Sequence, residues 1–442
     1  MKKILYFLIT SLIWVSCDQN DDVFFENPVT LGSIKLIRLR ADHNMILPDG
    51  KACMKFYPEA YNILELSNYT PDHSGDTTLY IPSVKRDTSL IPEDLLPEGL
   101  FQLLDEAGNE YPDFSFSTTD TVERTVRFHL EAGELRSNDL EIRIRPLPKT
   151  EYEEIVIPVV FHILKPALQP SIAPIEITPE TVQKNIDRLN AVFNGTVTTD
   201  PNGGNAKIIF KLAEYDDNGI PMAQPGMHTY EIPKKEELAD EDAYLAYIKS
   251  KGNTLMYDYK NFLNIWLINN PVISSSIVAV PTVVDRLPNP IPGSIATLIP
   301  DNFPERITDV GFCINMSYFV NPMQSTDYFE ISAVMAQYLG LLSTQVIENY
   351  AGTNFIDGDT DYCGDTPYYW SNGNSVFKNN SKDGTEDNIL YFTSYHVMDG
   401  YSYKNSISCD QVTRIRLNLE HSPSRLMYKS IFAFTGKIED KK

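Results

Sequence analysis

The fold of this chain is decided by the stretch Ile155-Val156-Ile157-Pro158-Val159-Val160-Phe161-His162-Ile163-Leu164. Nearly all of it is apolar, without the polar alternation of a strand that has one solvated face. A run of this kind is typical of a strand that other layers cover on both faces, as in an α/β domain. The segments around this strand therefore have to supply the covering layers.

Downstream of this strand, helix and strand patterns alternate. A helix begins at Thr178-Pro179-Glu180, where a capping hydroxyl precedes a proline at the first helical position, and Gly195 ends it. This alternation predicts a layered α/β domain with a mixed sheet over residues 152–442. The further elements that we expect are strands at residues 206–213 and 261–268 and helices at residues 235–251 and 410–419.

The most apolar helix is expected at residues 327–339. Asp327 can cap its N-terminus, and Glu330 stands where a capping-box partner belongs. Gly340 can turn the chain out of the helix. Because residues 331–336 have almost no polar face, the sequence predicts that this helix is buried in the core.

The region before residue 149 has a different hydrophobic pattern. Short alternating runs at residues 33–40, 125–130 and 140–144 are separated by turn residues. Repeated short strands of this kind predict an antiparallel β-sandwich over residues 29–148, so that the whole chain is of the α+β class. Residues 41–57 also resemble bacterial immunoglobulin-like domains, which implies a spacer or an adhesive surface. A stiff, proline-containing linker at residues 145–150 leads into the α/β domain.

The start of the chain predicts export and a lipid anchor. Two lysines precede an apolar run at residues 4–15, which is too short to span a bilayer and is typical of a signal peptide. The small residues before Cys17 resemble a lipoprotein signal-peptidase site. This resemblance implies that residues 1–17 are the signal and lipobox and that Cys17 becomes the lipidated N-terminus. A secretory signal that happens to contain a cysteine is the alternative.

The residues after Cys17 form an acidic tether, residues 18–28, which begins Asp18-Gln19-Asn20-Asp21-Asp22. This run resembles the surface-export signal of Bacteroidetes lipoproteins and implies an outer-membrane lipoprotein exposed at the cell surface. The formal net charge of −23 argues against nucleic acid and anionic lipid surfaces as partners. We therefore expect contact with the membrane only through the lipid anchor.

Several short segments of the α/β region stand in a characteristic order between about residue 154 and residue 425. They are residues 157–162, 177–180, 263–266, 361–367, 398–401, 409–416 and 422–425. Together they resemble the pappalysin-type, or cytophagalysin-type, zinc metalloproteases of the metzincin class. The resemblance implies a metzincin-like fold for the α/β domain. It also implies a methionine turn at Met398, interrupted here by Gly400.

The chemistry of that family requires the pattern His-Glu-x-x-His-x-x-Gly-x-x-His. Two histidines one helical turn apart face the same way, the glycine bends the chain toward the third, and the glutamate polarises the zinc-bound water. Here Ala333, Gln337 and Ser343 stand at the histidine positions and Val334 at the glutamate position. Only Gly340 is retained. We therefore expect neither zinc nor catalysis at this motif.

The histidines and carboxylates offer other candidate metal ligands. His162 lies in a strand where the family has no metal role, whereas His396 precedes Met398 and could approach the floor of the cleft. The spacing of four carboxylates admits either a calcium site or a solvated acidic loop, and the sequence leaves both open. These carboxylates are Asp357, Asp359, Asp361 and Asp365.

Four cysteines remain after Cys17. Cys363 and Cys409 fall at places where the resembling family carries cysteines, which implies a disulfide between them in an exported protein. Cys53 and Cys313 stand in apolar contexts and are expected to be buried thiols.

Three functions remain open from the sequence. The first is a non-catalytic pseudo-peptidase that has kept its cleft and binds a peptide, protein or glycan, or regulates a related active protease. The second is an active zinc metallopeptidase that uses ligands not recognised in the sequence. The third is an adhesive or structural surface module, which the β-sandwich would suit. The first is the reading that we adopt, so the chain is expected not to be an enzyme.

Overall fold

The structure is a computed structural model that describes most of the chain from residue 29 to residue 435. The described ranges are residues 29–72, 79–147, 151–166, 173–232, 238–269, 275–281, 283–284, 291–296, 303–324, 327–346, 361–370, 373–381 and 389–435. The predicted signal peptide, Cys17 and the acidic tether lie outside these residues, as do Asp357 and Asp359. Within the described residues, no helix has the length and apolar character needed to cross a membrane.

The chain divides into two compact units. One takes residues up to Leu39 together with Pro58–Leu104 and His129–Asn138, and the other takes Arg40–Tyr57, Asp105–Phe128 and the chain from Asp139 onward. The strand-rich N-terminal region therefore contributes segments to both units. The larger unit contains all of the α/β region.

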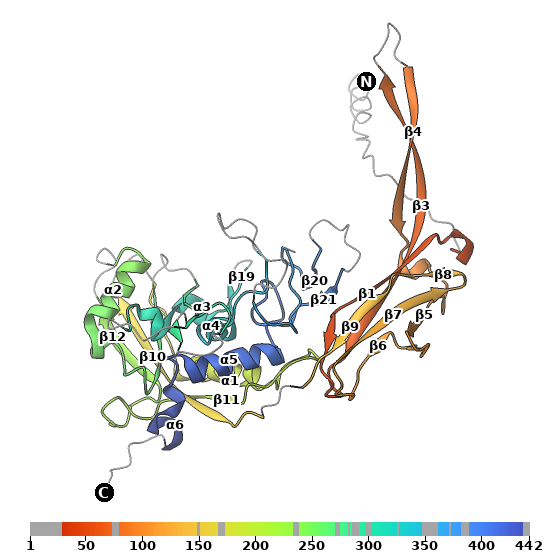
Figure 1. The fold of residues 1–442 in the computed structure, drawn as a ribbon. Helices are drawn as coiled ribbons and strands as arrows, with labels where there is room; N and C mark the ends of the chain where they lie inside the picture. The colour runs from red at the N-terminus through yellow and green to blue at the C-terminus, as the bar shows by residue number, and fades with distance from the viewer. Residues whose placement is uncertain are drawn as a thin grey trace, which may run out of the picture. The chain divides into compact units, whose positions relative to one another are not determined.

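Two sheets are built from the N-terminal strands. The first sheet contains β1 (Leu36–Ala41), β3 (Met54–Asp72) and β4 (Leu79–Leu90), and β6 (Ser115–Phe116) pairs with β3. The second sheet contains β2 (Met45–Ile46), β9 (Leu140–Ile144), β7 (Arg124–Ala132) and β5 (Gln102–Asp105), and β8 (Leu135–Arg136) pairs with β7. Figure 1 shows that β3 and β4 form a long hairpin. The rings of Phe56 on β3 and Phe128 on β7 pack together with centroids 4.8 Å apart.

The pairing of β2 with β9 departs from the antiparallel prediction. β2 runs parallel to β9, where the main-chain nitrogens of Arg143 and Arg145 donate to the carbonyls of Asn44 and Ile46 at 3.0 and 3.1 Å. A strand of two residues is too short to be set by its own alternation pattern, so its direction depends on the chain around it.

The central sheet of the larger unit is mixed, as predicted. Its strand order is β11-β10-β13-β17-β14, and β12 pairs with the far end of β10. All pairs are parallel except β14 with β17. The strands are β10 (Ile155–Pro166), β11 (Ile208–Leu212), β12 (Met227–Ile232), β13 (Leu263–Ile268), β14 (Ser276–Ile277) and β17 (Gly311–Asn315).

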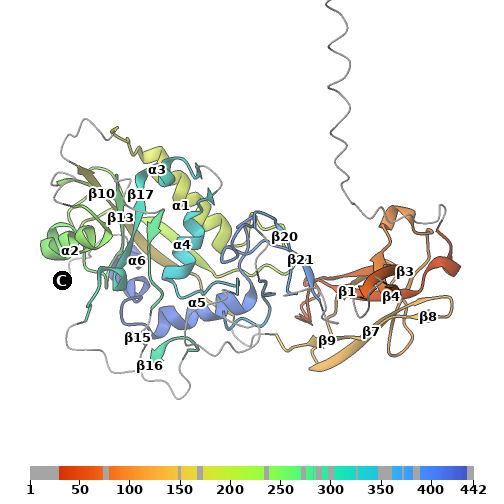
Figure 2. The ribbon, with the colours of Figure 1, turned by 90° about the horizontal axis from the view of Figure 1, so that it is seen from above.

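Helices cover both faces of this sheet. They are α1 (Pro179–Phe193), α2 (Glu241–Lys251), α3 (Met316–Val320), α4 (Ile331–Tyr338), α5 (Cys409–His421) and α6 (Ile431–Thr435). Leu263, Ile265 and Leu267 of β13 pack in one core with residues of α1, α4 and α5. Trp266 and Ile268 pack in a second core with α2. In Figure 2 the strands β10, β13 and β17 lie between α2 and the pair formed by α1 and α4.

The other described elements are short. They are β15 (Val283–Val284), β16 (Ile295–Ala296), β18 (Met323–Gln324), β19 (Asp327–Tyr328), β20 (Phe377–Asn379), β21 (Tyr391–Thr393) and the 3-10 helices η1 (Leu31–Ser33), η2 (Glu93–Leu95), η4 (Gly252–Thr254), η5 (Ile307–Asp309) and η6 (Met427–Lys429).

The caps decide where the predicted helices begin. Thr178 caps α1 as expected, and its hydroxyl accepts a hydrogen bond from the main-chain nitrogen of Thr181 at 3.2 Å. α2 begins at Glu241 rather than at residue 235, because the Asp240 carboxylate accepts from the nitrogen of Ala243 at 2.9 Å.

The predicted start of the buried helix was wrong. α4 begins at Ile331, and Asp327 lies in β19, which pairs with β18 in a short antiparallel ladder. Glu330 is the capping residue, with its carboxylate facing the nitrogen of Ser332 at 3.5 Å. The strand pairing takes the residues that the local capping pattern had assigned to the first turn. Gly340 turns the chain out after the helix, with a φ of +106°.

Candidate functional site

A cavity of about 500 Å³ opens beside α4. Ala333, Val334, Gln337 and Ser343 all line it. These are the four positions that the family resemblance aligns with three zinc ligands and a glutamate. Met398, the predicted methionine-turn residue, lines the same cavity. Met398 is far from the other four residues in the sequence, and the structure brings all five to the wall of one cavity.

The edge of the central sheet forms another part of the cavity wall. Ser275 and Ser276 line the cavity, and Ser276 begins β14, the last strand in the order of the described sheet. The end of the described sheet therefore contributes to the wall of the cavity beside the motif helix.

The residues at the motif positions do not fit a catalytic zinc ion. Ala333 has no donor atom, Gln337 offers an amide oxygen, and Ser343 offers a neutral hydroxyl, whereas zinc sites use imidazole, thiolate and carboxylate groups. Val334 has no group that can accept a proton from a bound water. In the part of the chain that the structure describes, no three His, Cys, Asp or Glu side chains converge as a metal site.

Two carboxylates also line the cavity, and both have hydrogen-bond partners from the protein. The Arg188 Nε lies 3.2 Å from Oε2 of Glu330. The Asp399 carboxylate accepts hydrogen bonds from the hydroxyls of Thr344 and Ser394. These contacts hold the cap of α4 and the segment around Met398 in place.

A buried lysine, Lys404, completes the cavity and was missed by the sequence reasoning. Its Nζ donates to the carbonyl oxygens of Val397 at 3.1 Å and Asp399 at 2.6 Å, on either side of Met398. Burial lowers the pKa of Lys404 to about 8, although Asp399 and Glu330 favour its charged form. Lysine in a polar, aromatic-rich loop is normally solvated, so no sequence signal marked this position.

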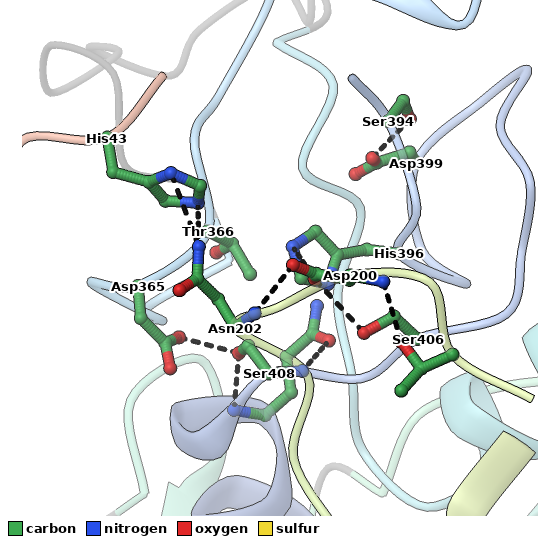
Figure 3. A network of polar contacts seen from close by, with 12 residues as sticks. His43, Asp200, Asn202, Asp365, Thr366, Ser394, His396, Asp399, Ser406 and Ser408 are labelled. Atoms are coloured by element: carbon green, nitrogen blue, oxygen red, sulfur yellow. Dashed lines mark hydrogen bonds and ion pairs between the residues drawn. The ribbon is translucent and has the colours of Figure 1, made fainter. Parts of the chain in front are cut away.

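His396 lies in a neighbouring polar network and not in the wall of this cavity. Its Nε2 is 3.8 Å from Oδ2 of Asp200, which also accepts from the Ser406 hydroxyl at 3.1 Å. Figure 3 shows His396 beside Asp200, with the hydrogen-bonded pair Ser394 and Asp399 on the next part of the same segment. The expectation that His396 approaches the cleft floor was therefore wrong: the ring lines a separate pocket together with Asp200.

Two of the four candidate calcium ligands can be followed in the structure. Asp361 accepts from the nitrogen of Cys363 at 3.1 Å and from the Thr366 hydroxyl at 2.7 Å. Asp365 accepts from the Ser408 hydroxyl at 2.5 Å and from the nitrogen of Asp410 at 2.9 Å. Both carboxylates thus satisfy donors of the surrounding chain. Calcium binding by the whole set of four remains a prediction.

The expected disulfide between Cys363 and Cys409 is not present in the structure, where both thiols are free. A hydrogen bond connects the residues that follow the two cysteines: the nitrogen of Gly364 donates to the Asp410 carboxylate at 3.0 Å. Burial and nearby carboxylates raise the pKa of both thiols, that of Cys409 to about 12. The thiolate needed for disulfide exchange is therefore disfavoured at both positions. Cys313 is a buried thiol, as predicted, and Cys53 is half-buried.

Comparisons with known proteins gave matches only among solved structures. No family model matches the chain, and no curated protein matches it. Mature mirolysin of Tannerella forsythia in complex with a cleaved peptide is 18% identical with a TM-score of 0.46, and the match covers 65% of this chain and 100% of that one. Mirolysin in complex with compound 9 is 19% identical with a TM-score of 0.45 and the same coverage. A promirolysin mutant from Tannerella forsythia is 20% identical with a TM-score of 0.44, covering 65% of this chain and 86% of that one. At these TM-scores the likeness says nothing about the chemistry of the cavity, which follows from its own residues.

Proposed function

We propose that this chain is a surface lipoprotein whose metalloprotease-like domain has lost catalysis and binds an extended peptide or protein segment in the cavity beside α4. One observation carries the proposal. Ala333, Val334, Gln337 and Ser343 have lost the groups that zinc chemistry requires, yet they still line an open cavity together with Met398. Its volume of about 500 Å³ lies in the range of ligand pockets.

The shape of the wall favours an extended peptide over a compact ligand. Ser275 and Ser276 bring the end of the described sheet into the cavity wall together with the residues of α4, and a ligand that lies along this wall would run in an extended conformation. The side chains of such a ligand would set its preference. A protein ligand would offer such a segment in a loop or at a terminus.

Hydrolysis would need both an activated water and a proton acceptor. Neither is supplied at the motif positions, because Val334 replaces the glutamate and the imidazoles are absent. The alternative, an active zinc metallopeptidase with other ligands, would need donors other than the residues at the motif positions. An adhesive or structural role of the N-terminal strands is compatible with a binding cleft and does not replace it.

Filling the cavity tests the binding function. Ala333→Trp places a large ring at the cavity wall, and we expect it to weaken retention of casein peptides on the immobilised protein at least ten-fold. Ala246→Trp, on an exposed position of α2, is the matched control and should retain peptides like wild type. Retained peptides are measured by mass spectrometry. Equal retention by all three proteins would show that the cavity is not the binding site, and chelator-sensitive cleavage of denatured casein by wild type would instead support the active peptidase.

The lipid anchor is tested separately in cells. Labelled palmitate is expected to enter the wild-type protein and not the Cys17→Ala variant, because Cys17 is the residue that the signal sequence presents for lipidation. The variant should also be released from the membrane fraction. Equal labelling of the two proteins would refute the anchor and leave the cleft proposal untouched.

A further inference from the structure

The cavity beside α4 contains a buried cation that forms no ion pair with any residue that the structure describes. Lys404 lines the cavity and is 9% exposed. Two of the three N–H groups of its Nζ donate hydrogen bonds to the carbonyls of Val397 and Asp399. Among the described residues, no carboxylate lies within salt-bridge distance of this nitrogen. One donor and the full charge of the group are therefore available to a molecule in the cavity.

The carboxylates that line the same cavity are already engaged. Glu330 is paired with Arg188, and Asp399 accepts from the hydroxyls of Thr344 and Ser394. They act on Lys404 through their field but do not contact its ammonium. A buried charge gains most from a partner that makes a direct, charge-assisted hydrogen bond. The cavity is therefore matched to a ligand that brings an anion.

The backbone holds Lys404 in a fixed position. Its φ is +47°, in the left-handed region that lysine rarely adopts. Its nitrogen donates to the Ser402 hydroxyl at 3.1 Å, and its carbonyl accepts from Nη2 of Arg188 at 3.0 Å. Strained residues that are held by their surroundings in this way gather at binding sites. Fixing the amine in advance reduces the entropy that a ligand must overcome.

We propose that Lys404 is the anion-recognition residue of this cavity and that the ligand is a peptide that places a carboxylate against its ammonium. The carboxylate is either the C-terminus of the peptide or an acidic side chain, since both offer the same chemistry. This inference rests on the proposed peptide-binding function and names the class of peptide. It also explains why an ammonium stands in a cavity whose walls have lost the groups for a metal cation.

The pH dependence of binding follows from the surroundings of Lys404. The lowered pKa of about 8 arises from burial, with Asp399 and Glu330 opposing it and Lys378 reinforcing it. At pH 7 the group is mainly charged, and it loses its charge as the pH rises above about 8. Binding of an anionic peptide should therefore weaken between pH 7 and pH 9.5, whereas binding of a neutral peptide should not.

The experiment uses casein peptides in three forms: with free carboxyl groups, with all carboxyl groups methyl-esterified, and with only the C-terminus amidated. Immobilised full-length protein is tested as wild type, as Lys404→Met and as Lys378→Met. Lys378 is the matched control because its side chain is also buried and donates to the carbonyl of Ser375 at 3.0 Å, but it lines a different cavity. Thermal melting checks that each variant is folded.

We expect wild type and Lys378→Met to retain the free acids at least ten-fold better than the esters at pH 7, and Lys404→Met to lose this preference. Loss of retention on amidation alone would assign the C-terminal carboxylate, and loss only on full esterification would assign an acidic side chain. Equal retention of acids and esters by wild type overturns this inference and leaves the proposed function standing. If wild type retains neither the acids nor the esters, both this inference and the proposed function are overturned. Should Lys404→Met fail to fold, the wild-type comparison of acids with esters between pH 7 and pH 9.5 decides the matter by itself.

Discussion

A variant that combines Ala333→His, Gln337→His and Ser343→His is expected to bind stoichiometric zinc, whereas the wild-type protein is expected to bind none. Positions 333 and 337 are one helical turn apart on α4, and all three positions line one cavity. Three imidazoles at such positions form a complete set of protein ligands for an open zinc site. Zinc sites of proteins contribute about 10–16 kcal/mol of binding, so the change from no site to a full site should be unmistakable.

Metal bound after dialysis is measured by atomic emission, with competition by a chelator to rank affinities. The double variant without the change at Ser343 is the control and should bind more weakly, because it has only two imidazoles. Adding Lys404→Met to the triple variant should tighten binding, since an ammonium in the same cavity opposes a metal cation. No zinc in the triple variant would show that the three positions do not converge, and stoichiometric zinc in wild type would establish the active-peptidase alternative.

The elements that the sequence predicted well are those in which one local cause dominates. β10 follows from its apolar run because both faces of the strand meet a hydrophobic core. α1 follows from Thr178, whose hydroxyl caps the first turn. The α1 helix depends on a capping residue next to it in the sequence, and β10 depends only on being covered by apolar residues. The prediction then requires no knowledge of the rest of the chain.

The errors arise where a partner outside the local pattern decides. Asp327 had a suitable capping pattern, but β18 pairs with its segment and moves the start of α4 to Ile331. His396 was expected near the cavity, but its ring lies beside Asp200, which is far away in the sequence. The convergence of the motif positions was expected from a family resemblance. The position of Lys404 had no signal of any kind, because its partners are main-chain carbonyls that every residue possesses.

The Gly340→Ala substitution is expected to destabilise the protein by about 3 kcal/mol, from backbone strain and overpacking together. Gly340 has a φ of +106°, which residues with a side chain rarely adopt. An added Cβ would lie 2.3 Å from Nδ2 of Asn418, a buried side chain that donates to the carbonyl of Arg414 at 3.0 Å. The carbonyl of Gly340 itself accepts from Nε of Arg414 at 2.7 Å. Neither α4 nor α5 can therefore move aside without losing hydrogen bonds in the core.

Gly252→Ala separates the two causes. Gly252 also follows a helix and has a φ of +50°, but an added Cβ would meet no atom within 4 Å. This control should lose only the strain contribution, about 1 kcal/mol. Urea unfolding followed by circular dichroism gives both values on the same scale. A loss for Gly340→Ala no larger than for Gly252→Ala would mean that Asn418 can yield, and that the turn after α4 is not locked against α5. A difference of about 2 kcal/mol would show that the packing of α5 fixes the turn that brings Ser343 to the cavity.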